Sequence, residues 1–223
     1  MVSKAYSVQM EIAGNTAIWT RPDTGDSPCS YPAPTFSAVK ALFESVLWGP
    51  SVLIEPVKVE ICSPIRYHSY ATNYGGPLRK KEAIKNGSNY QLYATVLTDV
   101  CYRLYALARP NLRKGKVPQT ALEWECHTTS PGHAYQEIFN RRLARGQSFA
   151  SLSLGWREFT PSYFGPFRKE TKVCSEIPDI VIPSMLREVF PAGYCSDWRA
   201  VYDTNLVIHQ GVLIYPERGR RRD

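Results

Sequence analysis

Residues Ile138–Phe159 read IFNRRLARGQSFASLSLGWREF and carry, one after the other, the two periodicities that decide the fold. Apolar side chains recur on one face from Ile138 to Leu143, which predicts a helix. Gly146 predicts the end of that helix, because glycine readily adopts the positive φ of a C-cap. The alternation of serine and leucine over Ser151–Leu154 then predicts a strand.

Three arginines of this stretch point to a ligand. Arg141, Arg142 and Arg145 lie at the helix end, beside a turn rich in glycine and serine. Guanidinium groups bind phosphate oxygens in pairs, and glycine lets the backbone come close, so this turn is a candidate phosphate site. The alternative is a solvated helix face followed by an ordinary turn, since charge runs usually face water.

The remaining elements are read outward from this stretch. Alternation over Ser7–Ala13 predicts a first strand that ends in a turn at Gly14-Asn15, and Pro34–Trp48 is the clearest helix. Val52–Ile61 is a strand in which Pro56 indicates an edge or a bulge, and Gln91–Ala108 is a long strand. Strand–helix–strand–strand–helix–strand is the order of an α+β, ferredoxin-like fold, the core of RNA-recognition domains.

The segment Pro64–Leu92 is poor in aliphatic residues, so we expect a protruding hairpin or long loop. It interleaves tyrosines, Tyr74 among them, with the cations Arg79, Lys80 and Lys81. Rings that stack on bases and cations that neutralise phosphates are what a single-stranded RNA surface requires. The alternative is an ordinary surface loop.

Elsewhere the chain carries weaker signals. Leu122–His133 is expected to be irregular, with the following helix starting near Ala134. Short strands at Asn205–Ile208 and Gly211–Tyr215 predict a small C-terminal sheet, and Arg218–Arg222 is a basic tail. We therefore expect a first domain over residues 1–165, with its hairpin insertion at about 64–92, and a small β-rich subdomain over 166–223.

The totals narrow the class of protein. The 223 residues hold 27 Lys and Arg against 20 Asp and Glu, a net charge of +7 that suits an RNA partner but is shared by many soluble proteins. No apolar run of about 20 residues and no signal peptide occur, so a cytoplasmic protein with no membrane partner is expected. Six dispersed cysteines suggest small buried residues. Cys126, His127 and His133 match no common zinc spacing, so neither metal nor cofactor is predicted.

Several pieces along the chain carry a family resemblance. They are Gly14–Pro22 (GNTAIWTRP), Ser30–Thr35 (SYPAPT), Glu44–Pro50 (ESVLWGP), Asn73–Gly76 (NYGG), Ile138–Gln147 (IFNRRLARGQ) and Leu154–Phe159 (LGWREF). In these pieces the chain resembles the Cas-five family of CRISPR–Cas effector complexes, in the RAMP superfamily, and most closely the subtype I-C, CasD-like branch.

The resemblance implies a ferredoxin-like RAMP fold with a thumb-like hairpin. Such a subunit of a Cascade interference complex would hold the repeat-derived 5′ handle of the CRISPR RNA in antiviral defence. It would lie beside the backbone and large subunits, and contact with target DNA near the flanking motif is an open alternative. The residues expected to bind RNA are Arg21, Tyr74, Arg79, Lys80, Lys81, Arg141, Arg142, Arg145, Gln147 and Arg157.

In subtype I-C the resemblance also implies a metal-independent endoribonuclease that cuts precursor CRISPR RNA. Active members carry Tyr or His where this chain has Leu47, and Lys-His where an ungapped match gives Ala134-Tyr135. A two-residue shift brings in Gly132-His133 instead, so His133 and Tyr135 are the catalytic candidates. The alternative for His133 is that it is only a polar residue at the start of the helix. The alternative for the whole chain is an unrelated single-stranded RNA-binding domain, which would not explain the matched motifs.

Overall fold

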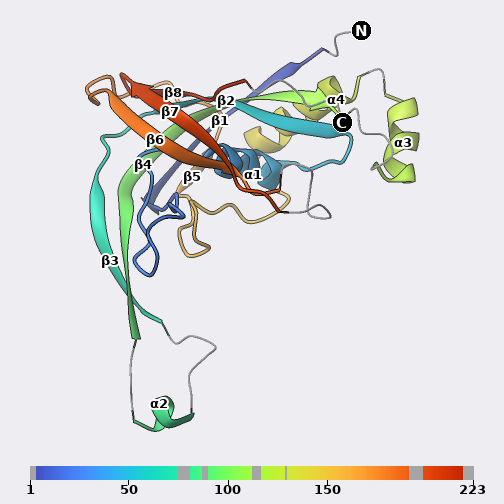
Figure 1. The fold of residues 1–223 in the computed structure, drawn as a ribbon. Helices are drawn as coiled ribbons and strands as arrows, with labels where there is room; N and C mark the ends of the chain where they lie inside the picture. The colour runs from blue at the N-terminus through green and yellow to red at the C-terminus, as the bar shows by residue number, and fades with distance from the viewer. Residues whose placement is uncertain are drawn as a thin grey trace.

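A computed structural model describes residues 4–74, 81–86, 90–111, 117–128, 130–190 and 198–217. It shows a mixed α/β protein built on a curled antiparallel sheet, with helices α1 and α4 packed on one face (Figure 1). Seven strands follow one another in the order β5-β1-β4-β2-β8-β7-β6, and β3 pairs with β4 off this path. The elements are β1 (Tyr6–Ala17), α1 (Phe36–Val46), β2 (Val52–Ile61), β3 (Tyr67–Tyr74), α2 (Lys81–Lys85), β4 (Tyr90–Pro110), α3 (Gln119–Cys126), α4 (Pro131–Ala144), β5 (Tyr163–Gly165), β6 (Ile180–Glu188), β7 (Val201–His209) and β8 (Val212–Ile214).

Strand β4 organises the sheet. Its first part pairs with β3, from Tyr90 to Leu97, and its later part pairs with β1 on one side and β2 on the other. Asp99, near the change of partners, has a φ of +52°, which Asp tolerates better than most residues. The β3–β4 ribbon consequently leaves the body and extends toward α2 (Figure 1).

Helix α1 and strand β2 confirm their predictions. The Thr35 hydroxyl caps α1 by accepting a hydrogen bond from the Ala38 N–H, and the apolar face of α1 is buried. Strand β2 has the predicted bounds, and its register with β4 shifts between Pro56 and Lys58, so the proline marks a bulge. Buried apolar side chains such as those of α1 each stabilise the fold by about 1.5–3 kcal/mol.

The turn expected at Gly14-Asn15 is wrong, because β1 continues to Ala17. Gly14 is needed for packing instead of a turn: a Cβ there would lie 2.4 Å from Leu154 Cδ1. The segment expected to be irregular contains α3, and α4 begins at Pro131, before Ala134. Helix α3 buries no residue, which explains why its sequence shows no apolar face.

The strand predicted over Ser151–Leu154 is also wrong. Leu152 and Leu154 are buried, as the alternation implied, but no strand pairs with them. The Leu154 carbonyl instead accepts a hydrogen bond from Ile18 N, and Leu154 N donates to the Phe159 carbonyl. The strand that follows α4 in the sheet is β5, which pairs with β1.

The C-terminal strands join the main sheet, because β8 pairs with β2 while β7 pairs with β8 and β6. A buried ion pair between Arg187 Nη1 and Asp203 Oδ2, 2.9 Å apart, links β6 to β7. Whether residues 166–223 act as a separate domain stays a prediction, and the predicted tail Arg218–Arg222 lies outside the described residues. Among the residues described, no helix is long and apolar enough to span a bilayer.

Candidate nucleic-acid interface

The C-terminal end of α4 presents two of the three predicted arginines to solvent. Gly146, with φ +63°, ends the helix, and Gln147 N donates back to the Arg142 carbonyl. Arg141 and Arg145 are exposed. Arg142 is half-buried and its Nη1 donates to the Val46 carbonyl at 3.2 Å, so this arginine fixes α4 against the end of α1.

Two aromatic side chains accompany these cations. The loop after α4 is fixed to α1, because Phe149 N and Ala150 N both donate to the Ser45 carbonyl, at 2.7 and 2.9 Å. The Phe149 side chain is nevertheless 67% exposed, and Trp48, directly after α1, is 55% exposed. Rings left in water beside cations are suited to stack on bases. Trp48, Arg141, Arg145, Gln147 and Phe149 are called the α4-end surface below.

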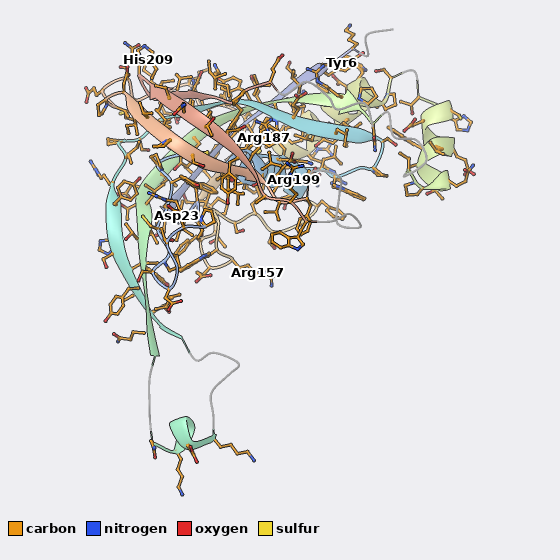
Figure 2. The ribbon with its side chains drawn as sticks, viewed as in Figure 1. Tyr6, Asp23, Arg157, Arg187, Arg199 and His209 are labelled. Carbon is orange, nitrogen blue, oxygen red and sulfur yellow. The ribbon has the colours of Figure 1, made fainter. Side chains whose placement is uncertain are left out.

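Arg157 belongs to a second region, at the base of the β3–β4 ribbon (Figure 2). Its loop is held by a stacked pair, Trp156 and Phe159, whose ring centroids lie 5.6 Å apart. Tyr70 of β3 packs edge-on against Phe159 at 5.4 Å, so the loop and the ribbon support each other. The Arg157 side chain itself is exposed and available to a ligand.

Arg21 is already engaged. Its Nε lies 3.1 Å from Asp23 Oδ1 and its Nη2 lies 2.7 Å from Asp23 Oδ2. The Asp23 hydrogen bond raises the pKa of the Arg21 guanidinium. Arg21 would therefore have to exchange Asp23 for a phosphate before it could bind RNA, although both groups are exposed and the exchange is sterically open.

The predicted ribbon residues are only partly described. Tyr74 ends β3 opposite Tyr90, and Lys81 is exposed at the start of α2, whereas Arg79 and Lys80 lie outside the described residues. Tyr67 and Tyr93 are about half-exposed on the ribbon, and both belong to the tyrosine-rich segment that the sequence indicated. Phe149 was missed, because one phenylalanine in a polar turn carries no pattern.

The two catalytic candidates do not converge. Each residue of a helix is rotated by about 100° from the one before it, so the side chains of His133 and Tyr135, two positions apart, face nearly opposite directions. Tyr135 is buried, its hydroxyl donates to the Leu47 carbonyl at 2.6 Å, and burial together with the Glu44 charge raises the pKa of its phenol. His133 is exposed, with its Nε2 4.0 Å from Glu137 Oε1 and its ring against Tyr6.

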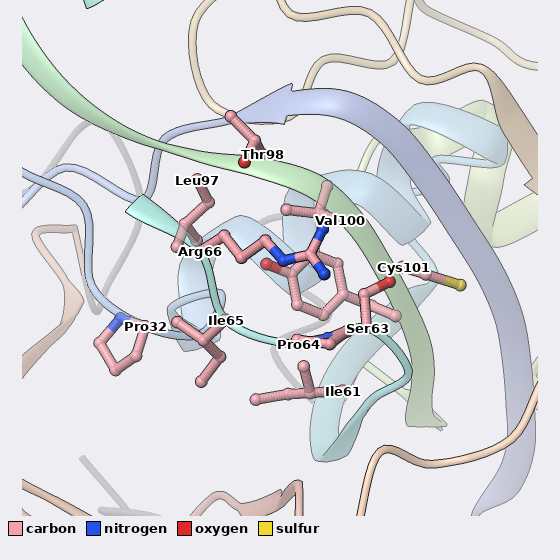
Figure 3. Close-up of a pocket in the computed structure, with 11 residues that line it drawn as sticks. Pro32, Ile61, Ser63, Pro64, Ile65, Arg66, Leu97, Thr98, Val100 and Cys101 are labelled. Atoms are coloured by element: carbon pink, nitrogen blue, oxygen red, sulfur yellow. The ribbon is translucent and has the colours of Figure 1, made fainter. Parts of the chain in front are cut away.

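Two hollows of the described surface lie apart from the predicted RNA-binding residues. A cavity beside Ile65, Leu97 and Tyr102 has a volume of about 10 Å³, room for one water (Figure 3). A larger space of about 220 Å³ lies open on the sheet, over Tyr105 and Ile214. Within the described ranges, no three His, Cys, Asp or Glu side chains gather as metal ligands would.

Comparison with known proteins identifies the family. The profile Cas_Cas5d, described as CRISPR-associated protein (Cas_Cas5), matches residues 7–181. Two relatives are named CRISPR pre-crRNA endoribonuclease Cas5d. The one from Thermus thermophilus is 30% identical over 71% of this chain and 63% of its own length. The one from Mannheimia succiniciproducens is 29% identical over 72% of each chain. The matched part thus spans less than two thirds of the Thermus relative.

Solved structures show the same architecture. A crystal structure of a CRISPR-associated protein superposes with a TM-score of 0.69 at 17% identity, covering 97% of this chain and 95% of that one. A functionally uncharacterized protein from Streptococcus mutans gives a TM-score of 0.67 at 16% identity, covering 96% and 95%. The fold is that of a CRISPR-associated α/β protein. The profile match, which spans most of the chain, shows that it belongs to the Cas5 family of CRISPR-associated proteins, in its Cas5d branch.

Proposed function

We propose that this chain is the CRISPR RNA-binding subunit of a type I-C-like Cascade complex and holds the 5′ handle of the RNA. In this proposal the core is ferredoxin-like, the β3–β4 ribbon is its thumb, and the backbone and large subunits are its neighbours. Contact with target DNA at the flanking motif belongs to the same proposal. The observation that carries it is the α4-end surface, where exposed cations and exposed rings lie at the neighbouring ends of α1 and α4 on a chain of the Cas5 family.

The α4-end surface divides the work of binding in the way that single-stranded RNA requires. Arg141 and Arg145 neutralise phosphates, while Trp48 and Phe149 offer faces on which bases can stack. Arg142 takes a different part: it is bonded to the Val46 carbonyl and keeps the two helix ends in place. Arg157, exposed in the loop that packs against the ribbon, is a separate cation for the same RNA.

The test is the salt dependence of binding to labelled 5′-handle RNA. Each phosphate contact that is lost lowers the slope of log K against log salt by about 0.7 for a single strand, so Arg141→Ala and Arg145→Ala should each show that reduction. Lys172→Ala is the matched control, because Lys172 is an exposed cation of the segment that follows β5, outside the α4-end surface. Slopes equal to that of the control would remove these arginines from the site.

A second function is favoured by the position of His133. Its imidazole is exposed, on the helix whose far end carries Arg141 and Arg145. We propose metal-independent cleavage of precursor CRISPR RNA, in which a ribose 2′-hydroxyl attacks the adjacent phosphate and His133 accepts its proton. Buried Tyr135 would position α4 and stay away from the scissile bond.

Cleavage is tested with end-labelled repeat RNA in excess EDTA. Cutting by the wild type that His133→Ala abolishes, with RNA binding intact, is the expected result. Tight binding without cutting would refute the nuclease proposal and leave the handle-binding role standing.

A further inference from the structure

At the start of β1, Tyr6 lies against His133 and Lys4 lies over the Tyr6 ring. The Tyr6 and His133 rings meet edge-on with their centroids 5.5 Å apart. Lys4 Nζ lies 5.4 Å from the centre of the same tyrosine ring. Gly132 allows this approach, because a Cβ at that position would come within 2.9 Å of the Tyr6 ring and 3.3 Å of the Ala108 carbonyl.

The hydrogen bond that the Tyr6 hydroxyl accepts leaves its own proton available. Ser130, which precedes α4, makes no side-chain cap on the helix, and its hydroxyl donates to the Tyr6 oxygen at 3.2 Å. A phenol can accept one hydrogen bond and still give its own proton to another group. The Tyr6 hydroxyl can therefore serve as the proton donor to a departing oxygen.

From these contacts we propose that Tyr6 and Lys4 complete the cleavage site around His133, with Tyr6 as the general acid and Lys4 as the cation beside the phosphate. The inference rests on the proposed RNA cleavage. It gives catalytic roles to Tyr6 and Lys4, which the sequence alone did not indicate.

One exposed strip of α4 connects this cluster to the RNA-binding end. His133, Glu137, Asn140, Arg141 and Ala144 follow a spacing of three and four residues, and all of them are exposed. At 1.5 Å per residue, Arg141 lies about 12 Å and Arg145 about 18 Å along the helix from His133. A strand held at the α4-end surface can therefore follow this strip to the cluster. Tyr6 lies well away from Arg157 in Figure 2, so the ribbon base belongs to another part of the path.

The chemistry requires a base, an acid and a positive charge. His133 takes the proton of the 2′-hydroxyl on a ring nitrogen. The 2′-oxygen then forms its bond to phosphorus while the bond from phosphorus to the 5′-oxygen breaks. Tyr6 gives its proton to that departing oxygen, and Lys4 offsets the charge on the phosphorane. The products are a 2′,3′-cyclic phosphate and a free 5′-hydroxyl, with no other reactant.

The decisive experiment uses two RNA substrates, one natural and one with sulfur in place of the 5′-bridging oxygen at the cleavage site. A departing thiolate needs no proton, so loss of the general acid should matter with oxygen and not with sulfur. For Tyr6→Phe we expect a single-turnover rate about 100-fold lower or more on the natural RNA, with RNA affinity within about twofold, and recovery on the sulfur substrate. His133→Ala should remain slow on both.

Two further variants complete the design. Lys4→Gln, at an exposed position that folding tolerates, should lower the rate on both substrates. Tyr163→Phe removes an equivalent hydroxyl on β5, where it donates to the Pro166 carbonyl at 2.6 Å, and is the matched control, expected to cut normally. A Tyr6→Phe protein that folds and cuts natural RNA within about threefold of wild type, or that sulfur does not rescue, overturns the assignment of Tyr6 even if wild-type cleavage stands. A wild type that binds the handle and cuts neither substrate overturns the cluster as a catalytic site together with the nuclease proposal.

Discussion

The ion pair between Glu11 and Arg168 gives the sharpest test of how this fold is held together. Glu11 lies on β1, between β4 and β5, and its side chain is fully buried. Arg168 Nε donates to Glu11 Oε1 at 2.6 Å and Arg168 N donates to Oε2 at 3.0 Å. The Thr171 hydroxyl donates a third hydrogen bond, to Glu11 Oε1, and Arg103 Nε lies 3.6 Å from Glu11 Oε2. These contacts fix the segment after β5 to the sheet.

We predict that Arg168→Leu destabilises the protein by about 3 kcal/mol at pH 7. Removing one partner of a buried pair costs roughly 3–5 kcal/mol, because the remaining charge is left in the interior. The low end applies here for two reasons. Arg103 and the Arg168 main-chain N–H remain, and the Arg168 side chain is itself 35% exposed. With a urea slope of about 2 kcal/mol/M, the unfolding midpoint should fall by about 1.5 M.

The pH dependence of unfolding shows independently whether the ionised Glu11 carboxylate stabilises the folded state. Burial raises the pKa of the Glu11 carboxyl, but the hydrogen bonds from Arg168 and Thr171 outweigh it, and the net shift is downward. A carboxyl whose folded-state pKa lies below its unfolded value binds fewer protons when folded, so its contribution is present at neutral pH and is lost as pH falls through the folded-state pKa. The difference between wild type and Arg168→Leu should therefore shrink in acid.

The assay is urea unfolding at pH 7 and at acid pH, with Glu11→Leu and the double variant Glu11→Leu/Arg168→Leu as the other corners of a cycle. The double variant should be more stable than Arg168→Leu alone, because the fully buried carboxylate is gone and Arg103 keeps its hydrogen bonds to the carbonyls of residue 168 and Thr171. A loss below about 1 kcal/mol, or a loss that does not change with pH, would refute this account of the pair.

Three further changes follow from single contacts. Gly155→Ala should lower the melting temperature more than Gly25→Ala does. Both glycines have positive φ, but a Cβ at Gly155 would lie 1.8 Å from a carbonyl oxygen, whereas Gly25 has open space. Equal losses of melting temperature would contradict this. Tyr135→Phe should lower the free energy of unfolding by about 1 kcal/mol through loss of the bond to Leu47, and an unchanged urea midpoint would show that this bond contributes nothing. Thr35→Ala should cost about 1 kcal/mol as a lost helix cap, with Thr35→Ser retaining most of it; a serine variant as unstable as the alanine one would point to another cause.

Much of the fold was predictable because its signals are local. Helix α1 has an apolar face, a threonine cap and a Gly-Pro sequence soon after its end, and β2 has alternation that survives the bulge at Pro56. Ser151–Leu154 misled because burial of alternate leucines requires only an apolar surface, whereas a strand also requires a partner. Strand β6 was missed, since Pro183 interrupts its pattern.

The residues of the candidate site also fall into those with a local sequence signal and those that depend on distant contacts. The cations of α4 stand out in the sequence, because charge on one helix face is a local property. Phe149 can be recognised as a site residue only from the hydrogen bond between its backbone and the end of α1. Tyr6 can be recognised as one only from the position of β1 beside the start of α4. Contacts between residues more than a hundred positions apart, such as Tyr6 and His133, leave no trace in a single sequence.

The order of strands has a consequence for how the chain is made. Strand β2 is synthesised early, yet its partner on one side, β8, comes some 150 residues later, as their register of Lys58 with Ile214 shows. Ribosomes add about 5–20 residues per second, so for several seconds the N-terminal half can form β1, β4 and β2 while one edge of β2 lacks its partner. An open edge invites pairing with another chain. A nascent chain arrested before residue 212 should therefore depend on chaperones far more than the finished protein, in which the last short strand closes that edge.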